Sequence, residues 1–160
     1  MNEPPRRRRL KRRGPAEGAV TAFVSDEQAA VSIDVERWQR LALAVLADEG
    51  VEGEAELSVM FVDEETIGDL NLRFMETDGP TDVLSFPMDE LRPGDDDKPS
   101  DPGLLGDVVI CPTIAAQQAI AAKHSTDDEI RWLLSHGILH LLGFDHAAPA
   151  EERIMFALQR

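Results

Sequence analysis

The chain has 160 residues, of which 42% are hydrophobic, and this length and composition fit one domain with a sizeable core. No apolar run approaches the roughly 18 residues of a membrane span, and no apolar segment of a secretory signal follows the basic first residues. We therefore expect no membrane partner. Cys111 is the chain's single cysteine, which rules out an internal disulfide framework and fits a cytoplasmic protein.

The charge is unevenly divided along the chain. The whole sequence carries −15, but residues 1–13 contain seven arginines and lysines and one glutamate, so that this segment carries +6 and the remainder −21. So acidic a body is not typical of a general nucleic-acid binder, because binding to phosphate depends on Lys and Arg. We predict a basic disordered tail over residues 1–19, either a binding arm or merely solvated, and a single domain over residues 20–160.

The predicted elements mix strands and helices without strict alternation. In chain order they are a short strand or hairpin from AVTAFV (19–24) and AVSI (30–33), a helix from Asp34 to about Glu49, a strand EAELSVMFVD (54–63), a helix EETIGDLNLRFM (64–75), strands DVLSFP (82–87) and LLGDVVIC (104–111), a helix PTIAAQQAIAAKH (112–124), a helix STDDEIRWLLSHGILHLLG (125–143) and a last helix from near Pro149. This order predicts an α+β fold, a small mixed β-sheet packed with about five helices.

The helix over residues 125–143 carries the clearest end signals. Thr126 and Glu129 have the spacing of a capping box at its start. Gly143 is the expected stop, where a positive φ would let the chain leave the helix. Trp132 and also Trp38, on the first helix, fit helix faces that point into the core rather than platforms for stacking bases.

Three of the four histidines lie in one stretch, SHGILHLLGFDH, over residues 135–146. His136 and His140 are four apart on the predicted helix, so both imidazoles leave the same face. The turn at Gly143 can return His146 toward that pair. Three neutral imidazoles that leave a fourth position for water are typical of catalytic zinc sites. We predict one Zn²⁺ per chain on these three residues, although nickel, cobalt or copper would also accept such ligands.

The spacing of the histidines is also similar to that of the metzincin metallopeptidases. In those enzymes a glutamate follows the first histidine and serves as the general base. Gly137 occupies that position here, so the proton acceptor of a peptidase is missing from the helix. The small residue would leave space for a larger substrate or for close packing against the sheet.

The segment HGILHLLGFDH resembles the metal-binding signature of the bacterial YbeY family of endoribonucleases. GPTDVLSFPMDE, LLGDVVICP and KHSTDDEIRWLLSHG resemble the other blocks of the family in the same order, so the similarity covers about residues 20–158. The resemblance implies a compact α+β fold with zinc held by His136, His140 and His146 at the end of a positively lined groove. The strand from Thr81 to Pro87 would form one wall beside the metal.

Further site residues follow from the residues and from the resemblance together. Many family members place an arginine directly after the aromatic residue of the second helix, where it serves RNA cleavage. This chain has Met75 after Phe74, and Arg73 before it is the candidate for the phosphate-binding role. Ser85 is a candidate to line the site, and Asp145 to orient an imidazole or act as a base. Three further polar residues have weaker claims, and each has a structural alternative. Asp82 could instead cap the turn after Pro80, Asp107 could lie at a strand edge, and His124 could lie at the surface or at a helix end.

The function that the resemblance implies is zinc-dependent, single-strand-specific cleavage of RNA. Its setting would be ribosomal RNA maturation, including the 16S rRNA 3′ end, and ribosome quality control, with the small ribosomal subunit or its proteins as partners. Either water or the 2′-OH could be the nucleophile. Two alternatives remain, a metal-dependent hydrolase of another class such as a metallopeptidase, and a ribosome-assembly binding protein with a structural zinc.

Overall fold

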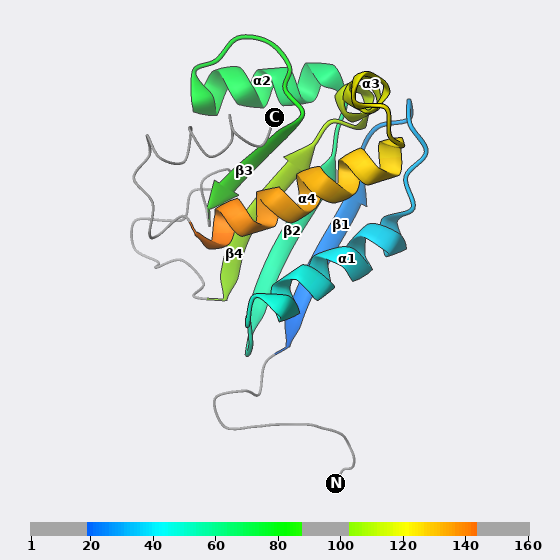
Figure 1. The fold of residues 1–160 in the computed structure, drawn as a ribbon. Coiled ribbons are helices and arrows are strands. Elements are labelled where there is room, and N and C mark those ends of the chain that lie inside the picture. The colour runs from blue at the N-terminus through cyan, green and yellow to red at the C-terminus, as the bar shows by residue number, and fades with distance from the viewer. Residues whose placement is uncertain (1–18, 88–102, 144–160) are drawn as a thin grey trace, which may run out of the picture.

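A computed structural model describes residues 19–87 and 103–143 of the chain (Figure 1). The predicted basic tail up to residue 18, Asp145, His146 and the helix predicted from Pro149 lie outside these residues. The described elements, in chain order, are β1 (Val20–Asp26), α1 (Val35–Asp48), β2 (Ala55–Phe61), α2 (Glu64–Met75), β3 (Val83–Pro87), β4 (Leu104–Ile110), α3 (Pro112–Ala122) and α4 (Thr126–Leu142).

The four strands form one mixed sheet in the order β1-β2-β4-β3. β1, β2 and β4 run parallel to one another, and β3 pairs with β4 in the antiparallel direction. The α+β class and the mixed sheet are therefore confirmed. The described residues form four helices, and the fifth predicted helix is the one that begins near Pro149.

Helices cover the sheet in two layers. α1 and α4 lie side by side over one face, and α3 packs against α4 (Figure 1). Their apolar side chains meet the sheet in the larger core cluster, which includes Trp38, Leu57 and Leu133. A second, smaller cluster contains Ile67 of α2 and the β-strand residues Phe86 and Val109. Because Val108 belongs to the first cluster and Val109 to the second, the two cores lie on opposite faces of the sheet.

Local signals place most of the elements as the sequence predicts. β2 alternates strictly between buried and half-buried residues over its seven positions. Asp34 and Asp63 cap α1 and α2, each by accepting a hydrogen bond from the backbone N–H three residues later. Pro112 stands at the first turn of α3, where its missing N–H costs nothing.

Of the two alternatives predicted for residues 19–33, the short strand is confirmed as β1, and the hairpin with a second arm at residues 30–33 is wrong. The side chain of Gln28 both donates to the carbonyl of Val31, at 2.8 Å, and accepts from the N–H of Val31, at 3.0 Å. This local pairing satisfies backbone groups that a strand would have used in a ladder. β1 pairs instead in parallel with β2, which follows it only after a helix.

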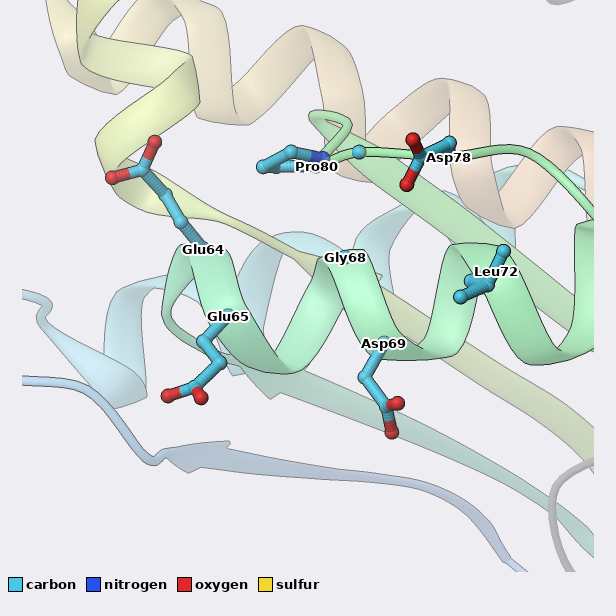
Figure 2. Close-up of a pocket in the computed structure, with 8 residues that line it drawn as sticks. Glu64, Glu65, Gly68, Asp69, Leu72, Asp78 and Pro80 are labelled. Atoms are coloured by element: carbon cyan, nitrogen blue, oxygen red, sulfur yellow. The ribbon is translucent and has the colours of Figure 1, made fainter.

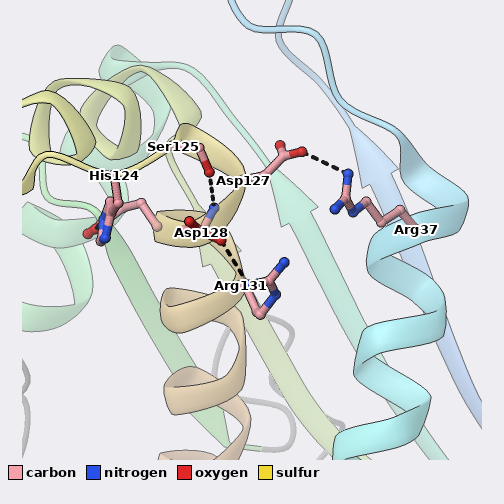
Figure 3. Close-up of polar contacts among 7 residues, drawn as sticks. Arg37, His124, Ser125, Asp127, Asp128 and Arg131 are labelled. Atoms are coloured by element: carbon pink, nitrogen blue, oxygen red, sulfur yellow. Dashed lines mark hydrogen bonds and ion pairs between the residues drawn. The ribbon is translucent and has the colours of Figure 1, made fainter.

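α4 differs from the prediction in its N-terminal cap and in the backbone angle at its C-terminal stop. Its N-cap is Ser125, whose Oγ accepts from the N–H of Asp128 at 3.0 Å, so the predicted capping box of Thr126 and Glu129 is wrong (Figure 3). The carboxylate of Glu129 contacts Nε2 of His124 instead, at 2.7 Å. Gly143 ends the helix as predicted, but with φ −87 rather than a positive φ. Within residues 19–87 and 103–143, no helix has the length and apolar content of a membrane span.

Candidate metal centre on helix α4

His136 and His140 lie one turn apart on α4, which packs over β3 and β4. Side chains at i and i+4 project from the same helix face, so the two imidazoles are neighbours. His136 is half-buried, whereas His140 is 7% exposed. The helix is anchored by buried leucines and isoleucines, which include Leu133, Leu134 and Ile138. Two predicted ligands therefore share one face of a fixed element.

The carbonyl of Trp132 selects the tautomer of the His136 ring. Nδ1 of His136 lies 2.9 Å from Trp132 O, and because a carbonyl oxygen only accepts, Nδ1 carries the proton. In the neutral ring Nε2 then keeps its lone pair. The indole of Trp132 also stacks on the imidazole, with ring centroids 4.1 Å apart and an interplanar angle of 29°. A ligand histidine in metalloproteins commonly donates its second nitrogen in this way.

His140 is held neutral by its surroundings. Burial lowers the pKa of its imidazole because desolvation disfavours the charged form. At neutral pH the ring is therefore uncharged, which is the form that binds metal ions. This supports His140 as a ligand donor.

The third predicted ligand, His146, and the predicted helper Asp145 lie outside the described residues. The part of the chain that the structure describes contains no group of three side chains suited to a metal ion. The structure thus places two of the three predicted ligands together, and the complete three-histidine centre stays a prediction.

Gly137 and Ser85 hold α4 close to the sheet. Gly137 is buried, and a Cβ added to it would lie 2.9 Å from Cγ1 of Val108 and 3.3 Å from Oγ of Ser85. Oγ of Ser85, on β3, donates a hydrogen bond to the carbonyl of Gly137 at 3.0 Å. The small residue therefore serves close packing, the second of the two predicted uses of its space. Ser85 contacts α4 through this bond, and its predicted catalytic role remains a prediction.

Arg73 lies on α2, whose core residue Ile67 belongs to the cluster on the other face of the sheet. Its guanidinium contacts the carboxylate of Asp69 at 3.4 Å and lies 5.3 Å from the centre of the Phe74 ring. In this conformation Arg73 interacts with its own helix. Met75, which stands at the family's arginine position, is 40% exposed.

Two of the three remaining polar candidates, Asp82 and His124, have local partners. Oδ1 of Asp82 accepts from the N–H of Val83 at 2.8 Å, which fits the predicted turn cap. Asp107 is fully buried within β4, a central strand, so its predicted place at a strand edge is wrong. His124 pairs with the buried carboxylate of Glu129 at the start of α4, as expected of a residue at a helix end. The sequence did not predict that Trp132 contributes to the site, because this residue was assigned to the core alone. Its i, i+4 spacing to His136 was the signal that could have revealed the contact.

A shallow hollow of about 550 Å³ lies along α2 (Figure 2), and neither His136 nor His140 lines it. It is lined by Glu64, Glu65, Gly68, Asp69, Leu72, Asp78, Gly79 and Pro80. Four of these residues are carboxylates, which would repel the phosphates of a nucleic acid. The hollow is therefore unsuited to hold an RNA strand.

Comparisons with known proteins find relatives that match most of the chain. A model of the family Endoribonuclease YbeY matches residues 23–160. The Endoribonuclease YbeY of Beutenbergia cavernae is 59% identical over 141 residues, which cover 88% of this chain and 93% of that protein. The protein of the same name from Thermobifida fusca is 59% identical over 132 residues, 82% of this chain and 85% of its own length.

A solved structure shares the fold. The solution structure of TM1509 from Thermotoga maritima is similar with a TM-score of 0.53 and 28% sequence identity, and the match covers 86% of this chain and 83% of that one. The family match and the curated relatives each span most of the chain. The chain therefore belongs to the Endoribonuclease YbeY family.

Proposed function

We propose that this chain is a zinc-dependent endoribonuclease that cleaves single-stranded ribosomal RNA, with 16S rRNA 3′ end maturation and ribosome quality control as its setting. The observation that carries the proposal is the pair of imidazoles, His136 and the buried His140, on one face of α4. The relatives named endoribonuclease supply the reaction class.

The donor set fits zinc. Zinc accepts neutral imidazole nitrogens, and three histidines with an open fourth position make a common catalytic site. His136 and His140 would hold one ion per chain together with His146, which follows the described part of α4. Bound zinc would supply a Lewis acid for cleavage of the phosphodiester bond.

The chain's own residues would orient the metal ligands and bind the substrate. The Trp132 carbonyl keeps a proton at Nδ1 of His136, so that Nε2 is left for the ion. Arg73 would bind a substrate phosphate after leaving Asp69, a surface partner that holds it weakly. Asp145 would orient His146 or accept a proton, and Ser85 would line the site beside Gly137.

The substrate and partners follow from the same proposal. Single-stranded rRNA is the substrate, and the small ribosomal subunit or its proteins would bring the chain to the cleavage site. We place the protein in the cytoplasm, where the free thiol of Cys111 would stay reduced.

A metallopeptidase is the second candidate, and Gly137 argues against it. The position that would carry the glutamate base faces Val108 and Ser85 within the packed layer between α4 and the sheet. A glutamate there would clash with the strands before it reached a water molecule. The third candidate, a binding protein with a structural zinc, predicts metal binding without turnover.

One experiment separates the three candidates. The full chain is purified with zinc and incubated with single-stranded rRNA and with an unfolded protein, beside the variant His140→Ala. We expect zinc-dependent RNA cuts in the wild type and a loss of at least about 100-fold in the variant. Cleavage of the protein without cleavage of RNA would overturn the proposal, and zinc binding with neither activity would favour the structural role.

A further inference from the structure

We propose that Trp132 is a positioning residue for the metal ligand His136, through its indole ring as well as its carbonyl. The inference rests on the proposed zinc site and names a determinant of its affinity. Two contacts carry it, the 2.9 Å hydrogen bond from Nδ1 to Trp132 O and the stacking of the two rings at 4.1 Å.

The two contacts restrict different properties of the imidazole: the hydrogen bond restricts its tautomer, and the stacking restricts its rotamer. The hydrogen bond selects the tautomer with the proton on Nδ1, but a ring that rotates away from the carbonyl would lose it. The indole face blocks one side of the imidazole, and an interplanar angle of 29° leaves the rings nearly parallel. The stacking therefore keeps the imidazole in the rotamer that makes the hydrogen bond and leaves Nε2 for a ligand.

The core fixes the indole itself. Trp132 is half-buried and packs against the main cluster, and its neighbour Leu133 is fully buried in that cluster. Pre-orientation of this kind lowers the cost of ordering a ligand when the ion arrives. Residues that orient a ligand histidine typically change metal affinity by 10- to 100-fold when they are replaced.

The test compares substitutions at the two tryptophans of the full chain. Trp132→Leu removes the aromatic face, and Trp132→Phe retains a ring that can stack. Trp38→Leu is the matched control, because Trp38 is 2% exposed in the same core cluster but its ring contacts the guanidinium of Arg37, at 5.4 Å, instead of a histidine. Thermal unfolding of each metal-free variant shows whether it folds.

The first readout is the zinc dissociation constant, measured by competition with a chromophoric chelator. We expect Trp132→Leu to bind zinc about 10-fold more weakly, and Trp132→Phe and Trp38→Leu to stay within about 2-fold of the wild type. Equal zinc affinity for folded Trp132→Leu and the wild type would overturn the inference. A similar loss in Trp38→Leu would overturn it too, because it would attribute the effect to general loosening of the core.

The second readout needs neither metal nor activity. Nitrogen NMR of the histidine side chains in the metal-free protein reports which ring nitrogen carries the proton. We expect His136 to be protonated on Nδ1 in the wild type and in Trp132→Phe, and to be a tautomer mixture in Trp132→Leu. Protonation at Nε2 in the wild type would overturn the inference, including where Trp132→Leu does not fold. A wild type that binds no zinc but shows the expected tautomers would contradict the proposed function and leave the orienting role of Trp132 in place.

Discussion

Gly137 stands between the two ligand candidates in sequence and faces the sheet, so it sets how closely α4 approaches β3 and β4. The side chain of Val108 is branched and fully buried, and it cannot swing away from an added Cβ at 2.9 Å. The bond from Ser85 to the Gly137 carbonyl forms at the same point. Gly137 thus accounts for two features. The helix lacks the base of a peptidase, and α4, which carries both histidines, lies close to the sheet.

Gly137→Ala is expected to destabilise the metal-free protein by about 1 kcal/mol. Overpacking of a core costs about 1–3 kcal/mol, and the better helix propensity of alanine offsets up to about 1 kcal/mol of this. Gly68→Ala on α2 is the matched control, because its Cβ would lie 3.5 Å from Pro80 N, an ordinary contact. It should stabilise by about 0.5–1 kcal/mol. Urea unfolding of both variants checks this, and shifts of the same sign would contradict the packing argument.

Helix α2 depends on its N-cap more than the buried helices do, because its interior is anchored by few buried residues, Ile67 and Asn71. Oδ1 of Asp63 accepts from the N–H of Thr66 at 2.8 Å. Hydrogen bonds from the side chain and the backbone of Thr66 lower the pKa of the Asp63 carboxyl. The ionised cap also faces the positive end of the helix dipole.

Asp63→Asn should make the stability of the protein less dependent on acid. A carboxyl with a lowered pKa in the folded state contributes stability above its unfolded pKa, about 4, and loses it as the pH falls through the folded value. Asparagine caps a helix without titrating. Thermal unfolding from pH 7 to pH 2.5 should show that the wild type is more stable than Asp63→Asn at neutral pH. This difference in stability should shrink below about pH 4. A difference that stays constant across that range would contradict the role of the cap.

The elements that sequence predicted well are those with a local physical cause. Asp34, Asp63 and Pro112 start helices by rules that involve only neighbouring residues. The errors arose where a side chain satisfied the backbone in a way that spacing does not reveal. Gln28 closes a turn onto Val31, and Ser125 takes the cap that Thr126 was expected to supply.

The sequence alone predicted that His136 and His140 would be neighbours, but it did not predict the contacts that hold them in place. The i, i+4 pair His136 and His140 needs only a helix to become neighbours. The burial of His140, the stacking of Trp132 and the bond from Ser85 to Gly137 depend on how α4 packs across two strands. Such tertiary packing cannot be read from spacing along one segment.

At the scale of the whole molecule, the described part of the chain has few positive charges that could attract RNA. Its cationic side chains are Arg37, Arg40, Arg73, Lys123 and Arg131. Three of these five have carboxylate partners, Asp127 for Arg37, Asp69 for Arg73 and Asp128 for Arg131; Figure 3 shows the first and the last. Exposed pairs of this kind are weak, but each acid still repels a phosphate nearby. The seven arginines and lysines of residues 1–13 are therefore the chain's densest source of positive charge.

Deletion of residues 2–13 should consequently weaken binding to single-stranded RNA at low salt and flatten its salt dependence. Each phosphate that a cation neutralises on a single strand contributes about 0.7 to the slope of log affinity against log salt. Loss of seven cations can therefore reduce the slope by up to about 5. Fluorescence anisotropy with a labelled single strand, from 50 to 300 mM salt, measures both the affinity and its salt dependence.

The matched control replaces the seven arginines and lysines by glutamine at unchanged length. It should behave as the deletion does, because the charge of the segment causes the effect. Unchanged RNA affinity at low salt in both variants would contradict this prediction and assign RNA binding to the acidic domain that follows the segment. The arginines of that domain would then have to leave their carboxylate partners in order to bind phosphate.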